Sequence, residues 1–166
     1  IAVDGVSLDE ERRRAYRHLF SAVFTDFHLF RRLLTGRGEE VAPDSAEEWM
    51  KRFEMQEKTA YVDGKLSNVD LSQGQRKRLA LILSLAEQRD FLVLDEWAAD
   101  QDPQFRKFFY RVLLPDLRAA GKAVVAITHD DHYFDVADRI VRMDGGQIVE
   151  LTGAARARAA AGGRTV

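Results

Sequence analysis

Hydrophobic and polar residues alternate along the chain in blocks that predict strands and helices in turn. Two short, wholly apolar runs, 91–94 and 123–127, are typical of strands buried on both faces of a parallel sheet. Between residues 73 and 88 the apolar residues recur with the i, i+3, i+4, i+7 spacing of one helical face. This face comprises Leu79, Ile82, Leu83 and Ala86. Strands that alternate with helices predict an α/β domain with a largely parallel sheet.

The remaining elements follow from caps, turns and shorter apolar runs. We expect a strand over 1–8 with an Asp4-Gly5 turn, a strand within 16–25, and a hairpin joining 139–143 to 147–151. Helices are expected from about 46, where Asp44 or Ser45 can serve as the cap, over 104–120 and over 130–137. Pro115 should kink the helix over 104–120 or end its regular part, because proline lacks the N–H that a helix uses. The polar stretch 44–70 interrupts the alternation and looks like an inserted helical subdomain. Residues 153–166 are rich in Ala, Arg and Gly and are predicted to be disordered.

Composition limits the classes of protein that the chain can represent. Its 166 residues fit one domain, and 46% hydrophobic with 31% charged residues is ordinary for a soluble globular fold. The count of zero cysteines excludes a disulfide scaffold and a thiolate metal site. A net charge of −2 provides no basic field for nucleic acid, and no apolar run has the length of a membrane span. The first residue is Ile1 rather than Met, which indicates a piece of a longer protein.

Two adjacent carboxylates follow the apolar run 91–94. In an open parallel sheet, ligands bind at the carboxyl ends of the strands, so Asp95 and Glu96 are expected at a ligand crevice. One carboxylate can hold Mg²⁺, directly or through water, and its neighbour can orient or deprotonate a water molecule. The alternative is a strand that simply ends in two solvated acids.

The start of the long predicted helix is a second candidate site. Ser72 and Gln75 have the spacing of a capping box, and Gly74 would let a ligand approach the backbone closely. A helix N-terminus attracts anions, whereas its dipole disfavours the three cations at 76–78, so a bound phosphate would offset their cost. The alternative is an ordinary capped helix with a basic exposed face.

A third polar residue follows the apolar run 123–127. His129 stands just past the carboxyl end of this predicted strand, where it could contact a γ-phosphate or steady an attacking water. A purely structural histidine is the alternative.

Several other conspicuous residues are expected to be structural. An aromatic stripe in the helix over 104–120 has plain helical periodicity and is predicted as core. It comprises Phe105, Phe108 and Phe109. Trp97 is expected to be a packing residue, and the basic run 12–14 is expected to be a solvated turn. The other three histidines, His18, His28 and His132, lack a convincing metal-ligand spacing with carboxylates.

The order of the three candidate sites resembles that of the ATP-binding cassette (ABC) family of ATPases. The matching segments are 71–75 as the signature motif, 91–96 as the Walker B strand, 98–102 as the D-loop and His129 as the switch histidine. A narrower similarity relates 95–103 and 127–134 to the exporters of cyclic peptides and peptide siderophores.

The resemblance implies a P-loop NTPase-like fold, with a mostly parallel sheet flanked by helices. Residues 1–152 would form a partial ABC ATPase domain, and about 30–88 its helical subdomain. The N-terminal strand and phosphate loop of that fold are expected to be absent, because no Gly-x-x-x-x-Gly-Lys-Ser/Thr occurs in the sequence. We therefore expect the isolated chain to bind ATP poorly and to be inactive. Gln73, where many relatives have Gly, and Thr25, at the usual glutamine of the Q-loop, are further departures.

The resemblance also implies a role for each candidate residue in the hydrolysis of ATP with Mg²⁺. Asp95 would orient Mg²⁺ through water, Glu96 would polarise the attacking water, and His129 would contact the γ-phosphate. The residues that would clamp the ATP held by the opposite subunit are Ser72, Gly74 and Gln75. Asp102 would belong to the loop that links the two sites.

The function implied for the intact protein is ATP-driven export of a peptide or siderophore-like substrate. Its partners would be a second copy, bound head to tail, and a membrane domain of the same or another chain, with no nucleic acid. Its place would be the cytoplasmic face of the bacterial inner membrane. One alternative is a soluble ABC-type ATPase that acts on DNA, although 44–70 is too short for the coiled coil usual there. The other is a non-catalytic fragment or partner-binding subunit.

Overall fold

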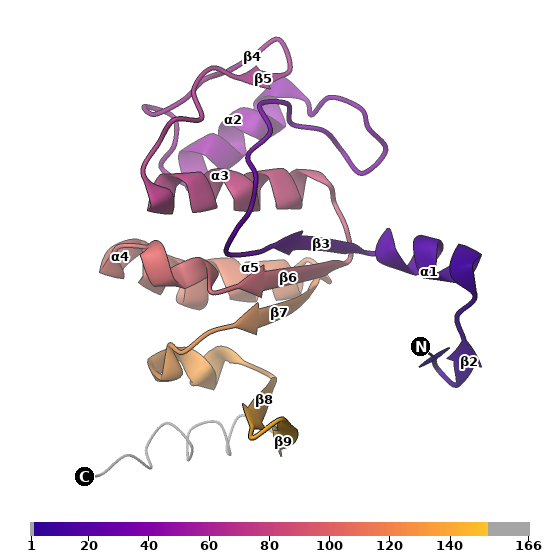
Figure 1. Ribbon diagram of the computed structural model, residues 1–166. Helices are drawn as coiled ribbons and strands as arrows, with labels where there is room; N and C mark the ends of the chain where they lie inside the picture. Colours follow the sequence, from indigo (N-terminus) through magenta and orange to yellow (C-terminus); the bar gives the residue numbers. More distant parts are fainter. Residues whose placement is uncertain (1, 153–166) are drawn as a thin grey trace.

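A three-stranded parallel sheet lies at the centre of the protein. The computed structural model describes residues 2–152, so Ile1 and the predicted disordered tail over 153–166 lie outside the described residues. The strands are β3 (Phe20–Val23), β6 (Phe91–Asp95) and β7 (Ala123–Ile127), and their order in the sheet is β3-β6-β7. All three run in the same direction, so their carboxyl ends meet at one edge (Figure 1). The predicted parallel α/β arrangement is confirmed.

Helix α3 (Gln73–Ala86) packs against the sheet and is buried on most of its surface. Leu79 and Ile82, from the predicted apolar face, are 0% exposed, and Leu81 on another face is also 0% exposed. The helix is buried widely because the sheet lies on one side of it and a second layer of chain on the other (Figure 1).

A second long helical segment contains three consecutive elements. They are α4 (Pro103–Phe108), a π-helical turn (Phe109–Leu113) and α5 (Leu114–Ala119). Pro115 does not end the helix, because the irregular turn lies just before it: the Leu114 N–H donates to the Phe109 carbonyl. A wider turn relieves the clash between the proline ring and the carbonyl one turn earlier. The predicted aromatic core is confirmed, with Phe105 and Phe109 buried and Phe108 partly buried.

The layer beyond α3 consists of α2 (Pro43–Arg52) and a short hairpin of β4 (Tyr61–Val62) with β5 (Lys65–Leu66). Helix α2 begins at Pro43 rather than near residue 46, and Ala42 caps it without a side-chain hydrogen bond. Proline favours a first helical position because its fixed φ suits the helix and its missing N–H is not needed there. The expected Asp44 or Ser45 cap is therefore wrong.

The N-terminal residues differ most from the sequence-based expectation. The hairpin of β1 (Ala2–Val3) and β2 (Val6–Ser7) has the predicted turn at Asp4-Gly5. Helix α1 (Glu10–Arg17) is present where a solvated turn was predicted over 12–14. Because this helix extends to Arg17, the strand expected within 16–25 is shorter than predicted. Asp9 caps this helix by accepting from the Arg12 N–H at 2.8 Å. Acidic residues in the first turn and arginines in the last turn suit the helix dipole. The basic run is exposed, but it lies on a helix.

The C-terminal described elements are a 3₁₀ helix, η3 (Asp131–Val136), and a hairpin of β8 (Arg139–Asp144) with β9 (Gln147–Thr152). Gly145 and Gly146 form the predicted turn with φ of 54° and 81°, which glycine adopts at little cost. Among the described helices, none is long and apolar enough to cross a membrane.

Strand β7 is not buried on both faces, as its apolar sequence predicted. Within the described residues it pairs with β6 alone, and Val125 and Ile127 are 54% and 51% exposed. Val125 is in register with Val93 and Ala22, and that face of the sheet is open to solvent in the described part of the chain. The apolar pattern identified a strand correctly but could not show which elements cover it.

Candidate functional site

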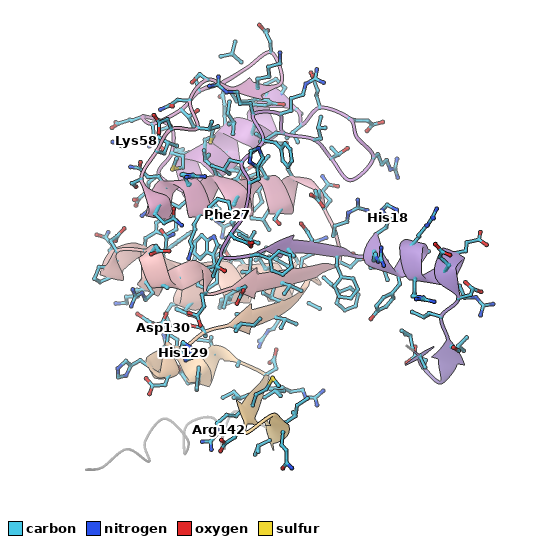
Figure 2. The ribbon with its side chains drawn as sticks, viewed as in Figure 1. His18, Phe27, Lys58, His129, Asp130 and Arg142 are labelled. Carbon is cyan, nitrogen blue, oxygen red and sulfur yellow. The ribbon has the colours of Figure 1, made fainter. Side chains whose placement is uncertain are left out.

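The carboxyl edge of the sheet brings two of the predicted site residues together. Glu96 follows β6 and His129 follows β7, and their Oε1 and Nε2 atoms are 3.2 Å apart. The His129 side chain is 97% exposed, whereas the Glu96 side chain is 27% exposed. Figure 2 shows His129 and Asp130 at the end of β7, beside the sheet. The pair therefore lies at the edge where parallel sheets bind ligands.

The backbone of Glu96 is left-handed, with φ 48° and ψ 33°. This conformation is uncommon for a residue with a side chain and costs about 1–3 kcal/mol, so the surroundings must hold it. The Glu96 N–H donates to the Ile127 carbonyl at 3.0 Å, and Lys77 Nζ donates to the Glu96 carbonyl at 2.6 Å. Glu96 is also the N-cap residue of the 3₁₀ helix η1 (Trp97–Asp100). Trp97 is buried, as predicted, and its indole N–H donates to the Lys77 carbonyl at 2.8 Å.

The predicted capping box at the start of α3 is confirmed. The Gln75 N–H donates to Ser72 Oγ at 3.4 Å, and the Ser72 N–H donates to Gln75 Oε1 at 3.2 Å. No hydrogen bond or ion pair in the described structure joins Ser72 or Gln75 to Glu96 or His129. The link between α3 and Glu96 lies further along the helix, at Lys77.

Position 74 requires glycine because the backbone of Asp100 packs closely against it. A Cβ at this position would lie 2.6 Å from the Asp100 carbonyl oxygen. The neighbouring Gln101 donates from Nε2 to the Gly74 carbonyl at 3.1 Å. The segment 97–102 therefore packs directly on the first turn of α3.

Two of the three cations that follow the capping box are buried and paired with carboxylates. The Lys77 side chain is 3% exposed and its Nζ lies 2.6 Å from Asp100 Oδ2. The Arg78 side chain is 10% exposed and contacts carboxylate oxygens of Asp102 at 2.6 Å and Glu54 at 3.2 Å. The alternative of a basic exposed face is wrong for these two residues. Their charge is balanced by protein carboxylates, so a phosphate is not needed to explain them.

Asp102 connects the start of α4 to α3. It caps α4 by accepting from the Phe105 N–H at 2.9 Å, and it also pairs with Arg78. The Phe105 N–H, and then the Arg78 guanidinium, hold the pKa of the Asp102 carboxyl below its ordinary value, since both stabilise the charged form. Arg78 also donates to Gln101 Oε1 at 2.9 Å and lies 3.5 Å above the centre of the Phe105 ring.

The residues on either side of His129 are held by groups that the sequence analysis did not identify. Tyr110 Oη lies 2.8 Å from Thr128 Oγ1 and 3.0 Å from Asp130 Oδ2, and burial raises the Tyr110 pKa. Arg106 lies 3.4 Å from Asp130 Oδ1 and donates to the Ala99 carbonyl at 3.2 Å. Helix α4 and the π turn thus position both neighbours of His129. Helical periodicity marked these residues only as members of a helix.

The donor set is compatible with Mg²⁺ bound together with phosphate. Among the described residues there is no group of three or more His, Asp or Glu side chains that could hold a metal ion by itself. Mg²⁺ is usually held by one or two carboxylates, while water and phosphate oxygens complete its coordination. The partly buried Asp95, which ends β6 beside Glu96, can supply such a carboxylate.

Comparison with known sequences places the chain in a family. The family model described as "ABC transporter" matches residues 1–99. The chain belongs to the ABC transporter family. It is 47% identical over 152 residues to the "ATP-binding protein SyrD" of Pseudomonas syringae pv. syringae. That alignment covers 90% of this chain and 27% of SyrD. It is 33% identical over 133 residues to an "Energy-coupling factor transporter ATP-binding protein EcfA2" of Mycoplasmopsis synoviae, covering 80% of this chain and 41% of that protein.

Solved structures of ABC proteins have the same fold. The cbiO1 protein of Clostridium perfringens, part of the ABC transporter complex cbiONQ, has a TM-score of 0.69 at 21% identity, covering 95% of this chain and 67% of its own. The ATP-binding cassette MJ0796, a dimer bound to ADP and Pi, has a TM-score of 0.65 at 24% identity, covering 91% and 72%. The expected P-loop NTPase-like fold is confirmed. The chain spans about a quarter of the length of SyrD and less than half of that EcfA2.

Proposed function

We propose that this chain is part of the ATP-binding and ATP-hydrolysing domain of an ABC exporter. The observation that carries the proposal is the 3.2 Å contact between the Glu96 carboxylate and the His129 imidazole at the carboxyl edge of the sheet. Family membership gives this pair its chemical context, and the 47% identity to an ATP-binding protein supports nucleotide as the ligand.

Each residue at the edge has a distinct part in the proposed reaction, transfer of the γ-phosphoryl group of ATP to water. Glu96 orients the attacking water and accepts its proton, and His129 donates a hydrogen bond to the γ-phosphate. Asp95 would hold Mg²⁺, directly or through water. When bound, Mg²⁺ neutralises charge on the phosphate oxygens. The left-handed backbone of Glu96 sets the direction in which its side chain leaves the chain. The position of the carboxylate therefore depends on the backbone conformation just after β6.

The start of α3 is proposed to act on a second ATP, held by another copy of the chain. Ser72, Gly74 and Gln75 would clamp that ATP, because the N-terminus of a helix attracts a phosphate. Two observations support a head-to-tail homodimer: Ser72, Gly74 and Gln75 make no described hydrogen bond with Glu96 or His129, and the dimeric MJ0796 cassette shares the fold. The segment that contains Asp102 joins the two parts and would link the two sites.

The intact protein is proposed to drive export of a peptide or siderophore-like substrate. It would act with a membrane domain of the same or another chain, at the cytoplasmic face of the bacterial inner membrane. The identity to SyrD and the matches to transporter ATP-binding proteins support this assembly. The 166 residues alone are proposed to bind ATP poorly and to be inactive, since their sequence contains no Gly-x-x-x-x-Gly-Lys-Ser/Thr loop.

The variant Glu96→Gln in the full-length protein tests the proposal. Glutamine keeps the shape of the side chain but is a far weaker base, so kcat for ATP hydrolysis should fall by about 10²–10⁴-fold while ATP still binds. Steady-state phosphate release and equilibrium ATP binding measure the two effects. The matched control is Glu57→Gln at an exposed position outside the edge, which should hydrolyse normally. Near-normal hydrolysis by Glu96→Gln would refute its assignment as the catalytic carboxylate.

A further inference from the structure

We propose that Lys77 is a positioning residue for the catalytic carboxylate, acting from α3 through the backbone of Glu96. This inference rests on the role proposed above for Glu96. Lys77 itself is expected to touch neither ATP nor the attacking water, because its charged end is occupied by groups of its own chain.

The Lys77 side chain contacts both ends of the short helix η1. Its Nζ donates to the Glu96 carbonyl at 2.6 Å, at the beginning of η1, and pairs with the Asp100 carboxylate at 2.6 Å, at its end. An ammonium group carries three N–H donors, so one lysine can hold both acceptors at once. The Lys77 carbonyl in turn accepts from the Trp97 indole N–H, which lies within η1. Lys77 therefore fastens η1 to α3 at three points.

Glu96 needs such a fastening because its backbone lies in the left-handed region. On one side of the residue the N–H is held by the Ile127 carbonyl. On the other side the carbonyl accepts from Lys77 and, at 3.3 Å, from the Ala99 N–H. With both peptide groups held, the side chain is free to face His129. Loss of the lysine would let the backbone relax toward an ordinary conformation and move the carboxylate.

The burial of Lys77 supports a positioning role over simple stabilisation. A charge that is 3% exposed loses most of its hydration, and a well-packed apolar side chain in its place is often as stable or more stable. The lysine is thus poorly explained by stability alone. What an apolar residue of similar size could not supply is the hydrogen bond to the Glu96 carbonyl.

The test uses Lys77→Met in the full-length protein, with Lys58→Met as the control at an exposed lysine (Figure 2). A misplaced catalytic group costs up to about 10²-fold in rate, so kcat of Lys77→Met should fall by about ten- to a hundredfold. ATP binding should change by less than about threefold, since the lysine does not touch the nucleotide. Lys77→Arg, which keeps a cation with N–H donors, should regain part of the lost kcat. Lys58→Met should match the wild type.

The double variant Lys77→Met/Glu96→Gln separates positioning from a general structural effect. If Lys77 acts through the Glu96 carboxylate, its loss should add little to the loss already caused by Glu96→Gln. Wild-type kcat in Lys77→Met, parallel loss of ATP binding and turnover in both Lys77 variants, or a full additional loss in the double variant would each overturn the inference about Lys77. A wild-type protein that hydrolyses no ATP, or a fully active Glu96→Gln, would instead overturn the proposed function.

Discussion

At the scale of single residues, Asp102 illustrates how one side chain serves two neighbours. It accepts from the Phe105 N–H at the start of α4 and pairs with the buried Arg78 of α3. Both contacts favour the charged carboxylate and lower its pKa. The same side chain is 53% exposed, so solvent screens the ion pair and keeps its contribution small.

This arrangement predicts how the stability difference between wild type and Asp102→Asn depends on pH. Asparagine keeps the helix cap but removes the charge, so the wild type should be more stable by less than about 1 kcal/mol. The folded-state pKa is lowered, so the advantage is complete above the ordinary value of 3.8 and is lost as pH falls through the lowered pKa. Urea unfolding of the chain from neutral to acid pH measures this difference. A stability difference that does not change with pH would show that it does not arise from the charge of the Asp102 carboxylate.

The sequence predicted the residues whose position follows from a local rule. The capping box of Ser72 and Gln75 depends only on neighbours in the chain, and strand-end placement located Glu96 and His129 at one edge. Lys77 was seen only as a cation near a helix start. Its acceptors, at residues 96 and 100, come from a distant segment that folds back on α3, and no local pattern shows which charges will meet.

At the scale of elements, the two faces of the sheet have different surroundings. Leu94 of β6 is 1% exposed, whereas Val125 of β7 is 54% exposed. Both residues belong to wholly apolar runs, so the sequence predicted the same burial for both. Which elements pack on a strand is a property of the tertiary fold, and an apolar run reports only that the strand can be buried.

Alanine substitutions at these two positions should therefore differ in cost. Leu94→Ala should lower the free energy of unfolding of the 166-residue chain by about 2–5 kcal/mol, because it leaves a cavity in the core. Val125→Ala should change it by no more than about 0.5 kcal/mol, as is usual at exposed positions. Equilibrium unfolding in urea compares the two variants under identical conditions. Equal losses in the free energy of unfolding would show that Val125 is buried in solution, which would contradict the exposed face of β7.

Helices were predicted best where an apolar face was present. The face of α3 was recognised and is buried, but α1 was missed, because its polar sequence has none of the apolar spacing used to find helices. Its signals were the Asp9 cap and the order of acidic and basic residues. Pro115 was predicted to kink the helix or end its regular part; regular α-helix does stop at Phe108, and a π-helical turn just before the proline lets the helix continue.

At the scale of the whole molecule, the two parts of the proposed nucleotide site, Glu96 with His129 and Ser72 with Gln75, are not joined by a hydrogen bond or ion pair within the described chain. The Glu96–His129 pair lies at the carboxyl edge of the sheet, whereas Gly74 in the first turn of α3 packs against Asp100 and accepts from Gln101. A second copy, placed head to tail, would bring the helix start of one subunit to the edge of the other. This geometry underlies the proposed dimer.

The nucleotide retained by the full-length protein after incubation with Mg²⁺ and ATP tests hydrolysis at this edge most directly. Wild-type protein and the variant Glu96→Gln are each separated from free nucleotide, and the bound ATP and ADP are then quantified. The wild type should retain mainly ADP, whereas Glu96→Gln should retain mainly ATP in a dimeric form, because it binds the nucleotide but lacks the base for the attacking water. ADP retained equally by both proteins would contradict the assignment of Glu96, and no nucleotide on either would contradict ATP binding.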